Sequence, residues 1–524
     1  ALGVGLGAFD LHDVSVTKLT SGQPTLRIEG RAKQLADARG ITSWQVSISH
    51  TDSVAIAVVA GILLINTFRF QKALTFEGAA VEIPKNDSAA IHLSNAIQIK
   101  TISFGDTLAI DTTEFTKFRS FMESTYPLMH QQLEKMTFNQ FSYVFKWKGK
   151  DTTAAPYVLM AHMDVVPVEA IAESKWTYPS FSGIIKNDTI WGRGAVDDKA
   201  SAIAIMETVE KLLKENHVPE RTTYLAFGHD EEIAGKRGAA IFSQWFKENN
   251  IKPAFVLDEG GQIDTQRFKD VGRPVAVIGT GEKGFVNIDL TVEIPGGHSS
   301  MPDKETAIDV LNQAIVKVRA QQMPAMISPS VGELLNRTGA AQSFFTRMVM
   351  SNMWMFKGMV ISKLEENKQT NAMVHTTIVP TIVKAGIKDN VIPSIAKATF
   401  NSRILPGETS EDVVNFVKKT INDERVMVKK QTISLMEPSA TTPTDHPAFK
   451  KLEGITNSIV PNALVSPYLM IGATDSRYFR GFSEAVLNFT PMQDAKGFHG
   501  IDERIGISDL NRMIAFYKQV ITSQ

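Results

Sequence analysis

A short apolar run that ends in a histidine and an aspartate constrains this chain more than any other feature. Residues 157–161 read Tyr-Val-Leu-Met-Ala, and His162, Asp164 and Pro167 follow. The run predicts a buried strand. Alternate residues of an extended chain point to the same side, so His162 and Asp164 can face one cleft. A neutral imidazole binds a transition metal, and a neighbouring carboxylate can fix its tautomer. Taken alone, the stretch fits a core strand that ends in a polar turn better than it fits a metal site.

Length and composition indicate a globular protein of at least two domains. A chain of 524 residues is too long for one ordinary core. Its hydrophobic fraction of 43% and charged fraction of 21% are those of globular proteins. The formal net charge of -1 gives no reason to expect a nucleic-acid partner. The sequence has no cysteine, so a metal would be held by histidines and carboxylates.

The N-terminal part divides into an unassigned segment, residues 1–52, and a hydrophobic segment, residues 53–70. Residues 53–66 carry no charge, and this run is shorter than the roughly 20 residues that span a bilayer comfortably. It has the character of a signal-peptide core or a short anchor. We therefore expect a secreted or membrane-anchored protein with some membrane association through this segment. A buried helix is the alternative.

Strands alternate with helices in the first half of the recognisable domain. Apolar spacing predicts helices over 90–99, 115–133, 201–216 and 237–248, and strands over 141–147, 157–161, 222–227 and 254–257. This order predicts an α/β catalytic domain with a largely parallel central sheet flanked by helices. Sites in such domains lie at the carboxyl ends of the strands. We place the first part of this domain at residues 89–282.

A second pattern begins near residue 283. Strand-like segments 284–292, 376–384, 396–403 and 426–434 enclose the predicted helices 304–319 and 410–421. This order predicts a smaller α+β lid domain inserted over residues 283–437. Residues 438–447 read as the returning linker. Residues 438–524 would then complete the catalytic domain.

Further acidic residues and a histidine follow predicted strands or turns of the larger domain. They are Asp197 and Asp198 after a Gly-rich turn, Glu231 and Glu232, Asp258, and His499. One acidic residue at a helix start is often only a cap. Two adjacent glutamates beside other acids are costly without a cation. Together these groups suggest a two-metal site with a free carboxylate that moves a proton.

These motifs resemble the di-zinc peptidase superfamily that contains carboxypeptidase S, aminoacylase and the desuccinylases. The resemblance covers roughly residues 90–524 and implies two Zn²⁺, with Co²⁺ or Mn²⁺ as substitutes. It implies that Asp197 bridges the two metals and that the ligands are His162, Asp197, Glu232, Asp258 and His499. By the same resemblance, Asp164 orients His162, and Glu231 is the general base and acid.

The lid supplies the remaining residues that the resemblance assigns. His298 lies in a Pro-Gly-Gly-His-Ser-Ser motif and would polarise the scissile carbonyl. Asn390 would contribute near the carbonyl, and Arg403 would pair with a substrate carboxylate. Gly472 begins a loop that would line this substrate site. In many relatives the lid dimerises, so we consider a homodimer in which His298 acts on the partner's site.

Within the superfamily, the motifs look nearer to the N-fatty-acyl-amino-acid synthase/hydrolase and carboxypeptidase S group. The favoured function is therefore hydrolysis, or reversible formation, of the amide bond of N-acyl amino acids with a free α-carboxylate. A carboxypeptidase that acts on short peptides is one alternative, and a catalytically silent binding scaffold is another. A Met- and Phe-rich stretch between residues 321 and 363 could form an acyl-chain groove, a lid core or a dimer face.

Overall fold

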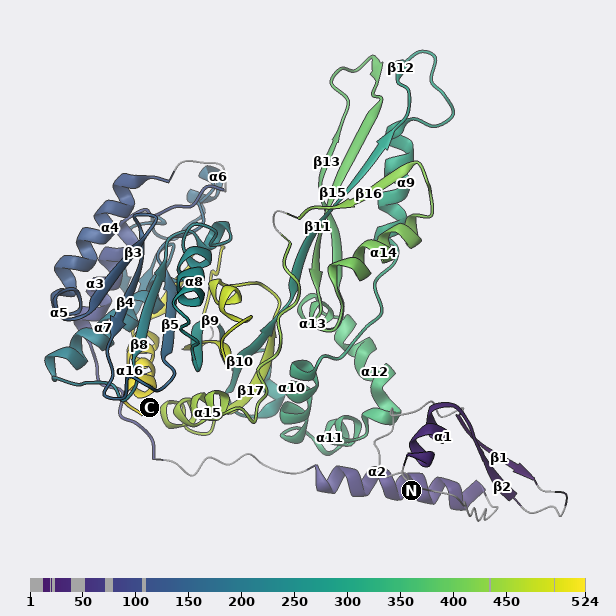
Figure 1. The fold of residues 1–524 in the computed structure, drawn as a ribbon, viewed down its shortest axis with the longest axis horizontal. Helices are drawn as coiled ribbons and strands as arrows, with labels where there is room; N and C mark the ends of the chain where they lie inside the picture. Colours follow the sequence, from purple (N-terminus) through teal and green to yellow (C-terminus); the bar gives the residue numbers. More distant parts are fainter. Residues whose placement is uncertain are drawn as a thin grey trace. The chain divides into compact units, whose positions relative to one another are not determined.

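The computed structural model describes residues 13–18, 20, 24–38, 52–70, 79–105, 110–432, 435–493 and 495–523. The chain forms two compact units. The first unit comprises residues 1–73 and 342–362, and the second comprises residues 74–341 and 363–524. Figure 1 shows the elements of both units.

A mixed eight-stranded sheet forms the centre of the second unit, in the order β17-β10-β18-β9-β5-β8-β4-β3. The middle of the sheet, from β18 through β9 and β5 to β8, is parallel, whereas β3 and β4 are antiparallel additions. The strands are β3 (Glu134–Phe138), β4 (Ser142–Trp147), β5 (Tyr157–His162), β8 (Thr223–Gly228), β9 (Phe255–Asp264), β10 (Val275–Glu282), β17 (Leu464–Met470) and β18 (Val486–Gln493). The expected α/β architecture is thus confirmed, with a sheet that is mixed rather than largely parallel.

Helices cover both faces of this sheet, and the strand residues alternate between the two cores (Figure 1). Leu159 of β5 packs in the larger core, whereas Val158 and Met160 pack in the other. The larger core receives α3 (Asp87–Gln98), α4 (Thr112–Thr125), α5 (Pro127–Gln132), α7 (Lys199–Lys214), α15 (Pro447–Ile459) and α16 (Ile507–Thr522). The opposite core receives α8 (Ala239–Glu248) and η4 (Asp475–Phe479). Both faces are covered, which explains why β5 and β8 are buried at every residue.

The helix predicted over 115–133 is two helices, because Pro127 begins α5 directly after the end of α4. Proline lacks the amide hydrogen that would continue α4, yet it is well suited to a first helical turn. Smaller elements of the catalytic domain are α6 (Ala170–Glu173), β6 (Ile185–Lys186), β7 (Thr189–Trp191), η2 (Glu231–Ile233), η3 (Lys269–Val271) and β19 (Arg504–Gly506).

The lid is an antiparallel sheet in the order β13-β15-β11-β16 with two helices packed on it (Figure 1). Its elements are β11 (Gly284–Glu293), α9 (Ala307–Arg319), β13 (Thr377–Ala385), β15 (Ile395–Ile404), α14 (Ser410–Ile421) and β16 (Val426–Lys430). Every second residue of β11 is buried against α9 and α14. The inserted lid that the sequence predicts is confirmed, and β12 (Gly297–His298) pairs with β14 (Val391–Ile392) beyond its sheet.

Between α9 and β13, Met323 packs in the lid core, whereas the helices α10 and α13 belong to another core cluster. α10 (Pro329–Ala340) packs on β17 of the catalytic sheet through Val331 and Leu334. α13 (Lys368–Val374) carries backbone carbonyls that accept hydrogen bonds from the buried Lys283 ammonium group. The range predicted as one lid domain, residues 283–437, therefore contains segments that pack in the lid core, segments that pack on the catalytic sheet, and residues 342–362, which belong to the first unit.

The first unit contains the hairpin β1 (Val14–Lys18) and β2 (Pro24–Ile28), and helices α1 (Gly30–Asp37), α2 (Asp52–Arg69), α11 (Phe344–Ser351) and α12 (Met353–Glu365). The last residues of α12 pass into the second unit. The hydrophobic segment 53–70 thus forms most of α2. In the part of the chain that the structure describes, none of the helices combines the length and apolarity needed to cross a membrane.

Candidate active site

Polar side chains from five chain segments meet near the carboxyl ends of β5 and β8. His162 is the last residue of β5 and lies beside Gly228, the last residue of β8. Glu231 and Glu232 follow β8 in the short helix η2. The tight turn before α7 contributes Asp197. Parallel strands end at one edge of a sheet, and this brings the groups together.

Asp197 lies between the two histidines. Its Oδ1 is 2.9 Å from His162 Nε2, and its Oδ2 is 2.7 Å from His499 Nε2. Glu232 Oε2 is 3.2 Å from the same His499 nitrogen. One carboxylate that faces two imidazoles has the arrangement required of a bridging ligand.

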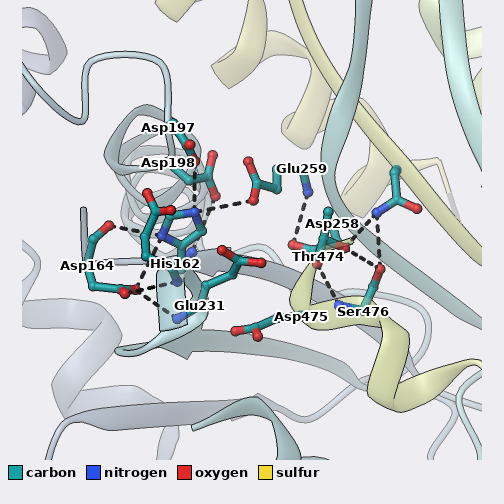
Figure 2. A network of polar contacts seen from close by, with 12 residues as sticks. His162, Asp164, Asp197, Asp198, Glu231, Asp258, Glu259, Thr474, Asp475 and Ser476 are labelled. Atoms are coloured by element: carbon teal, nitrogen blue, oxygen red, sulfur yellow. Dashed lines mark hydrogen bonds and ion pairs between the residues drawn. The ribbon is translucent and has the colours of Figure 1, made fainter. Parts of the chain in front are cut away.

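Asp164 holds both the histidine and the glutamate pair in place (Figure 2). Its Oδ1 is 3.4 Å from His162 Nδ1, and the ring also lies 3.0 Å from the Asp164 backbone oxygen. The backbone N–H groups of Glu231 and Glu232 donate to the two oxygens of Asp164 at 3.1 and 3.2 Å. Asp164 therefore directs His162 Nε2 towards Asp197 and sets the orientation of η2.

The acidic pair in β9 presents Glu259, rather than Asp258, to this cluster (Figure 2). Glu259 Oε1 is 3.3 Å from His162 Nε2. The oxygens of Asp258 accept the backbone N–H groups of Glu259 and Ser476 at 3.0 and 2.8 Å. Successive residues of a strand point to opposite sides, which is why only one of the two can face His162.

A buried carboxylate that the sequence analysis did not select supports the turn before α7. Glu503 Oε1 accepts the backbone N–H groups of Gly194, Val196 and Asp197 at 3.0, 2.8 and 3.1 Å. Its Oε2 pairs with Arg193 at 2.5 Å. Gly194 has a φ of +90°, which side chains rarely adopt, so the turn needs glycine there. Glu503 lies four residues after His499, and that spacing is the only signal the sequence carries for it.

The electrostatics of the cluster fit a cation. Burial, and then the charge of Asp197, raise the pKa of Glu232 to about 7. Burial alone would lower the pKa of His162, but Glu259, Asp164 and Asp197 raise it. Among the described residues, Glu232 Oε1 and Asp198 Oδ1 are buried and accept no hydrogen bond. Buried carboxylates without donors are costly, and a dication would satisfy them.

Two overlapping groups of donor atoms have the compactness of a metal site. His162, Asp197 and Glu232 form one group, and His162, Asp198 and Glu259 form the other. The atoms of each group lie within 4.8 Å of one another. Imidazole and carboxylate donors in this number suit zinc and also cobalt or manganese.

The carboxyl group of Glu231 lies near Arg477. The Arg477 Nη2 is 4.0 Å from Glu231 Oε1 and 3.9 Å from Asp475 Oδ1. Burial raises the pKa of Glu231 well above its usual range, His162 opposes this, and the charge of Asp475 adds to it. A carboxyl group with a raised pKa, next to the predicted metal ligands, has the properties of a general acid and base.

A cavity of about 1320 Å³ opens beside these residues. Glu231, Glu232, Glu259 and His499 line one side of it. Gly472, Arg403 and Arg477 line it as well. The Arg403 guanidinium stacks on Phe285 at 4.9 Å, and no carboxylate among the described residues pairs with it. The cavity therefore joins the acidic cluster to a cationic region that can hold an anion.

The apolar lining of this cavity includes Phe285, Leu435, Met436, Tyr468 and Met470. The Met- and Phe-rich stretch that the sequence offered as a groove is divided instead. Met323 is buried in the lid core, whereas residues 344–359 belong to the first unit. The apolar side chains beside the predicted metal ligands thus come from the lid base and the catalytic sheet.

His298 and Asn390 lie together in the lid, outside the lining of this cavity. The Ser299 backbone N–H donates to the Asn390 carbonyl at 3.2 Å. His298 is exposed, and its Nδ1 lies 2.7 Å from Ser300 Oγ. Six of the eleven predicted site residues line the cavity, and His162, Asp164 and Asp258 lie behind this lining in contact with it, whereas His298 and Asn390 lie apart.

Comparison with known proteins agrees with this geometry. A family model described as "Peptidase family M20/M25/M40" matches residues 158–523. The class is that of metal-dependent hydrolases that combine such a catalytic sheet with a lid. The chain belongs to peptidase family M20/M25/M40. The prediction of a metal-dependent hydrolase is therefore confirmed.

Two relatives show where in the family the chain falls. It is 38% identical to the probable carboxypeptidase S-like 2 of Dictyostelium discoideum over 482 residues, 88% of this chain and 91% of the relative. It is 34% identical to the human N-fatty-acyl-amino acid synthase/hydrolase PM20D1, over 82% of this chain and 86% of that protein. The resemblance to these two groups is thus confirmed.

Solved structures share the fold. An M20 family metallo-carboxypeptidase from Sulfolobus solfataricus superposes with a TM-score of 0.60 at 17% identity, and covers 83% of this chain and 99% of its own. Human carnosine dipeptidase 1 superposes with a TM-score of 0.56 at 12% identity, over 88% of this chain and 99% of its own.

Proposed function

We propose that this chain hydrolyses the amide bond of N-acyl amino acids that carry a free α-carboxylate, and that it can form the same bond in reverse. The observation that carries the proposal is the cavity. It places a cationic wall and apolar side chains next to the acidic cluster. The substrate class needs these three features: an anchor for the carboxylate, a surface for the acyl chain and a catalyst between them.

The residues that would hold two cations fall into two sets. Glu259, His162 and Asp197 would hold one, and Asp197, Glu232 and His499 the other. Glu259 replaces Asp258 in this assignment because it faces His162 at 3.3 Å. Such cations activate water at neutral pH and polarise a carbonyl. Zn²⁺ is the expected ion, with Co²⁺ or Mn²⁺ as substitutes.

Glu231 carries the proton in the proposed reaction. It accepts a proton from the attacking water as the new carbon–oxygen bond forms. It then donates that proton to the nitrogen of the leaving amine as the carbon–nitrogen bond breaks. Its position beside Glu232, and its contact with Arg477 at 4.0 Å, hold the carboxyl group at the edge of the cavity.

Arg403 would bind the substrate carboxylate, and Gly472 would leave room beside it. Arg403 is largely buried, and burial, followed by the neighbouring Arg477, lowers its pKa. Two guanidinium groups close enough to repel each other favour an anion between them. His298 and Asn390 would complete the site at the carbonyl oxygen only when a lid is brought to it, and in a homodimer that lid would be the partner's.

A carboxypeptidase acting on short peptides is the second candidate, because the same cavity would bind the C-terminal carboxylate of a peptide. The carboxypeptidase S-like relative from Dictyostelium discoideum supports it. A catalytically silent scaffold is not supported, because every predicted metal ligand except Asp258 contributes a side chain to the cluster.

One assay separates these candidates. Release of phenylalanine from oleoyl-phenylalanine and of leucine from glycyl-leucine would be measured by liquid chromatography, with and without a chelator. Our proposal expects chelator-sensitive cleavage of the acyl amino acid at a kcat/KM at least tenfold above that for the dipeptide. The opposite ratio would favour the carboxypeptidase, and the absence of both activities in metal-loaded protein would favour the scaffold. The hydrophobic segment 53–70 is expected to lead to secretion or membrane association, which fractionation of expressing cells would test.

A further inference from the structure

In the first unit, α2, α11, α12 and the residue between α11 and α12 bury polar side chains, while many of the large apolar side chains of these helices are exposed. α2 and α11 lie side by side (Figure 1). Polar side chains of α2 meet polar side chains at the end of α11 and at the residue that follows it. Asn66 Nδ2 donates to Asn352 Oδ1 at 2.8 Å, and Thr67 Oγ1 lies 3.4 Å from Ser351 Oγ. Thr67 and Asn352 are both 0% exposed. Hydrogen bonds between polar residues therefore join the two helical segments.

The outer surface of the same helices is apolar. Ile65, Phe68 and Phe345 are 52%, 63% and 64% exposed. Further exposed members of this surface are Ile62, Leu64, Phe344, Trp354, Met355 and Met359. Phe68 and Phe344 pack ring against ring at 6.0 Å, which makes the surface continuous from α2 to α11. Large exposed apolar surfaces mark interaction sites, and polar contacts inside with apolar residues outside are typical of helices in lipid.

Most of the charged residues of these three helices are basic. α2, α11 and α12 contain the basic residues Arg69, Arg347, Lys357 and Lys363, and their acidic residues are Asp52 at the start of α2 and Glu365 at the end of α12. The whole chain has a formal net charge of -1, so this excess of positive charge is local. Arg69 and Lys357 are exposed. Basic residues that border apolar side chains favour a surface that is apolar inside and anionic outside.

We infer that α2, α11 and α12 form a docking surface for an anionic phospholipid membrane. Trp354 and the phenylalanines would lie among the headgroups and upper acyl chains, where aromatic side chains are favoured. The basic residues would contact the lipid phosphates. The inference needs no catalytic activity and goes beyond the proposed reaction, because it concerns where the enzyme works.

The sequence alone pointed to residues 53–70 and could not show a second element. The insertion at 342–362 lies almost three hundred residues further along the chain, yet it shares the buried polar contacts with α2. Both segments are therefore needed for the surface.

Vesicle co-sedimentation of the full chain tests this inference. The probes are vesicles of pure phosphatidylcholine and vesicles with one-fifth phosphatidylglycerol. We expect binding to the anionic vesicles to exceed binding to the neutral ones at least fivefold, and to weaken in 0.5 M NaCl. The double variant Phe345→Ser/Trp354→Ser is expected to bind at least tenfold more weakly. The control variant Ile171→Ser/Val316→Ser removes two exposed apolar side chains from the second unit and should bind like the unmodified chain.

Three outcomes would overturn the inference. One is equal sedimentation with and without anionic vesicles. Another is unchanged binding of the Phe345/Trp354 variant. The third is light scattering that shows a dimer of the unmodified chain which this variant converts to a monomer, since a second copy would then cover the surface. Cleavage of a soluble short-chain acyl amino acid, equal in all variants, would show that the variants are folded, and a loss of vesicle binding alone leaves the proposed hydrolysis intact.

Discussion

Glu231 and Glu232 are adjacent in the chain, yet their carboxyl groups face different partners. Glu232 lies 3.2 Å from His499, whereas Glu231 lies 4.0 Å from Arg477. The backbone N–H groups of both donate to Asp164, and this fixes the direction in which each side chain leaves η2. Glu232 is therefore placed to hold a metal, and Glu231 is placed to move a proton.

Glu231→Gln tests the proton-transfer role. Glutamine keeps the size of the side chain but cannot accept and return a proton. We expect kcat to fall by about 10²–10⁴-fold, the usual value of general acid–base help, while the bound metal stays as in the unmodified chain. Steady-state kinetics and metal analysis of the same preparation give both quantities. A variant with near-normal kcat would remove Glu231 from the mechanism.

The pair Glu259→Gln and Asp258→Asn tests which acid of β9 binds metal. Glu259 faces His162, so its amide variant should retain less metal than the unmodified chain after dialysis. Asp258 instead accepts two backbone hydrogen bonds, so its amide variant should keep the metal and lose stability. Metal content and thermal unfolding of the two variants would be compared. The reverse pattern would restore the assignment of Asp258 made from the sequence.

At the scale of elements, the connection after β8 links the core to the site. His229 follows β8 and packs edge-on against the rings of Phe115 and Phe141. Its Nδ1 lies 2.6 Å from Ser142 Oγ of β4. Burial, partly opposed by Asp164, lowers the pKa of His229 to about 4, from 6.5 for an ordinary histidine. The segment that carries Glu231 and Glu232 is thus held by a neutral imidazole.

This shift predicts a loss of stability in acid. Between pH 6.5 and 4 the unfolded chain binds a proton at His229 that the folded chain does not, so the free energy of unfolding falls as the pH falls. The full effect across this range is about 3 kcal/mol, because each pKa unit corresponds to roughly 1.4 kcal/mol. In urea unfolding at pH 7 and pH 5, His229→Gln should lose less stability between the two pH values than the unmodified chain. The exposed His298 offers a control, since His298→Gln should keep the full loss.

At the scale of the whole molecule, the lid presents an unpaired edge strand and an isolated histidine. β13 forms one edge of the lid sheet, and its exposed residues include Val379, Ile382 and Val383. An apolar edge strand is a ready template for pairing with a second chain. His298 is exposed and lies outside the lining of the cavity. We therefore expect a homodimer in which each lid serves the partner's site.

Mixing two inactive variants tests this arrangement. Glu231→Gln removes the base from a site, and His298→Ala removes the donor on a lid. If each His298 acts on the partner's site, unfolding and refolding the two variants together should form mixed dimers with one intact site. Activity should then exceed the sum of the separate variants at least tenfold. If mass measurement detects mixed dimers but the activity does not rise, His298 acts on its own subunit or not at all.

The local pattern of the sequence was sufficient to predict most of the helices and strands and the types of residue in the site. The alternating apolar residues of 284–292 correspond to β11, and the helical spacing of 201–216 corresponds to α7. His162, Asp197, Glu232 and His499 could be selected because each follows a strand or a turn in a motif, and parallel strands end at a common edge.

Tertiary packing decided what a local pattern cannot contain. Whether Asp258 or Glu259 faces the site depends on a one-residue step in strand orientation, which only the pairing of β9 with β5 and β18 determines. Glu503 holds the Asp197 turn from 306 residues away, and the insertion 342–362 packs on α2 rather than on the lid. Side-chain chemistry and spacing are properties of neighbours in the chain, whereas these contacts arise only when distant segments share one core.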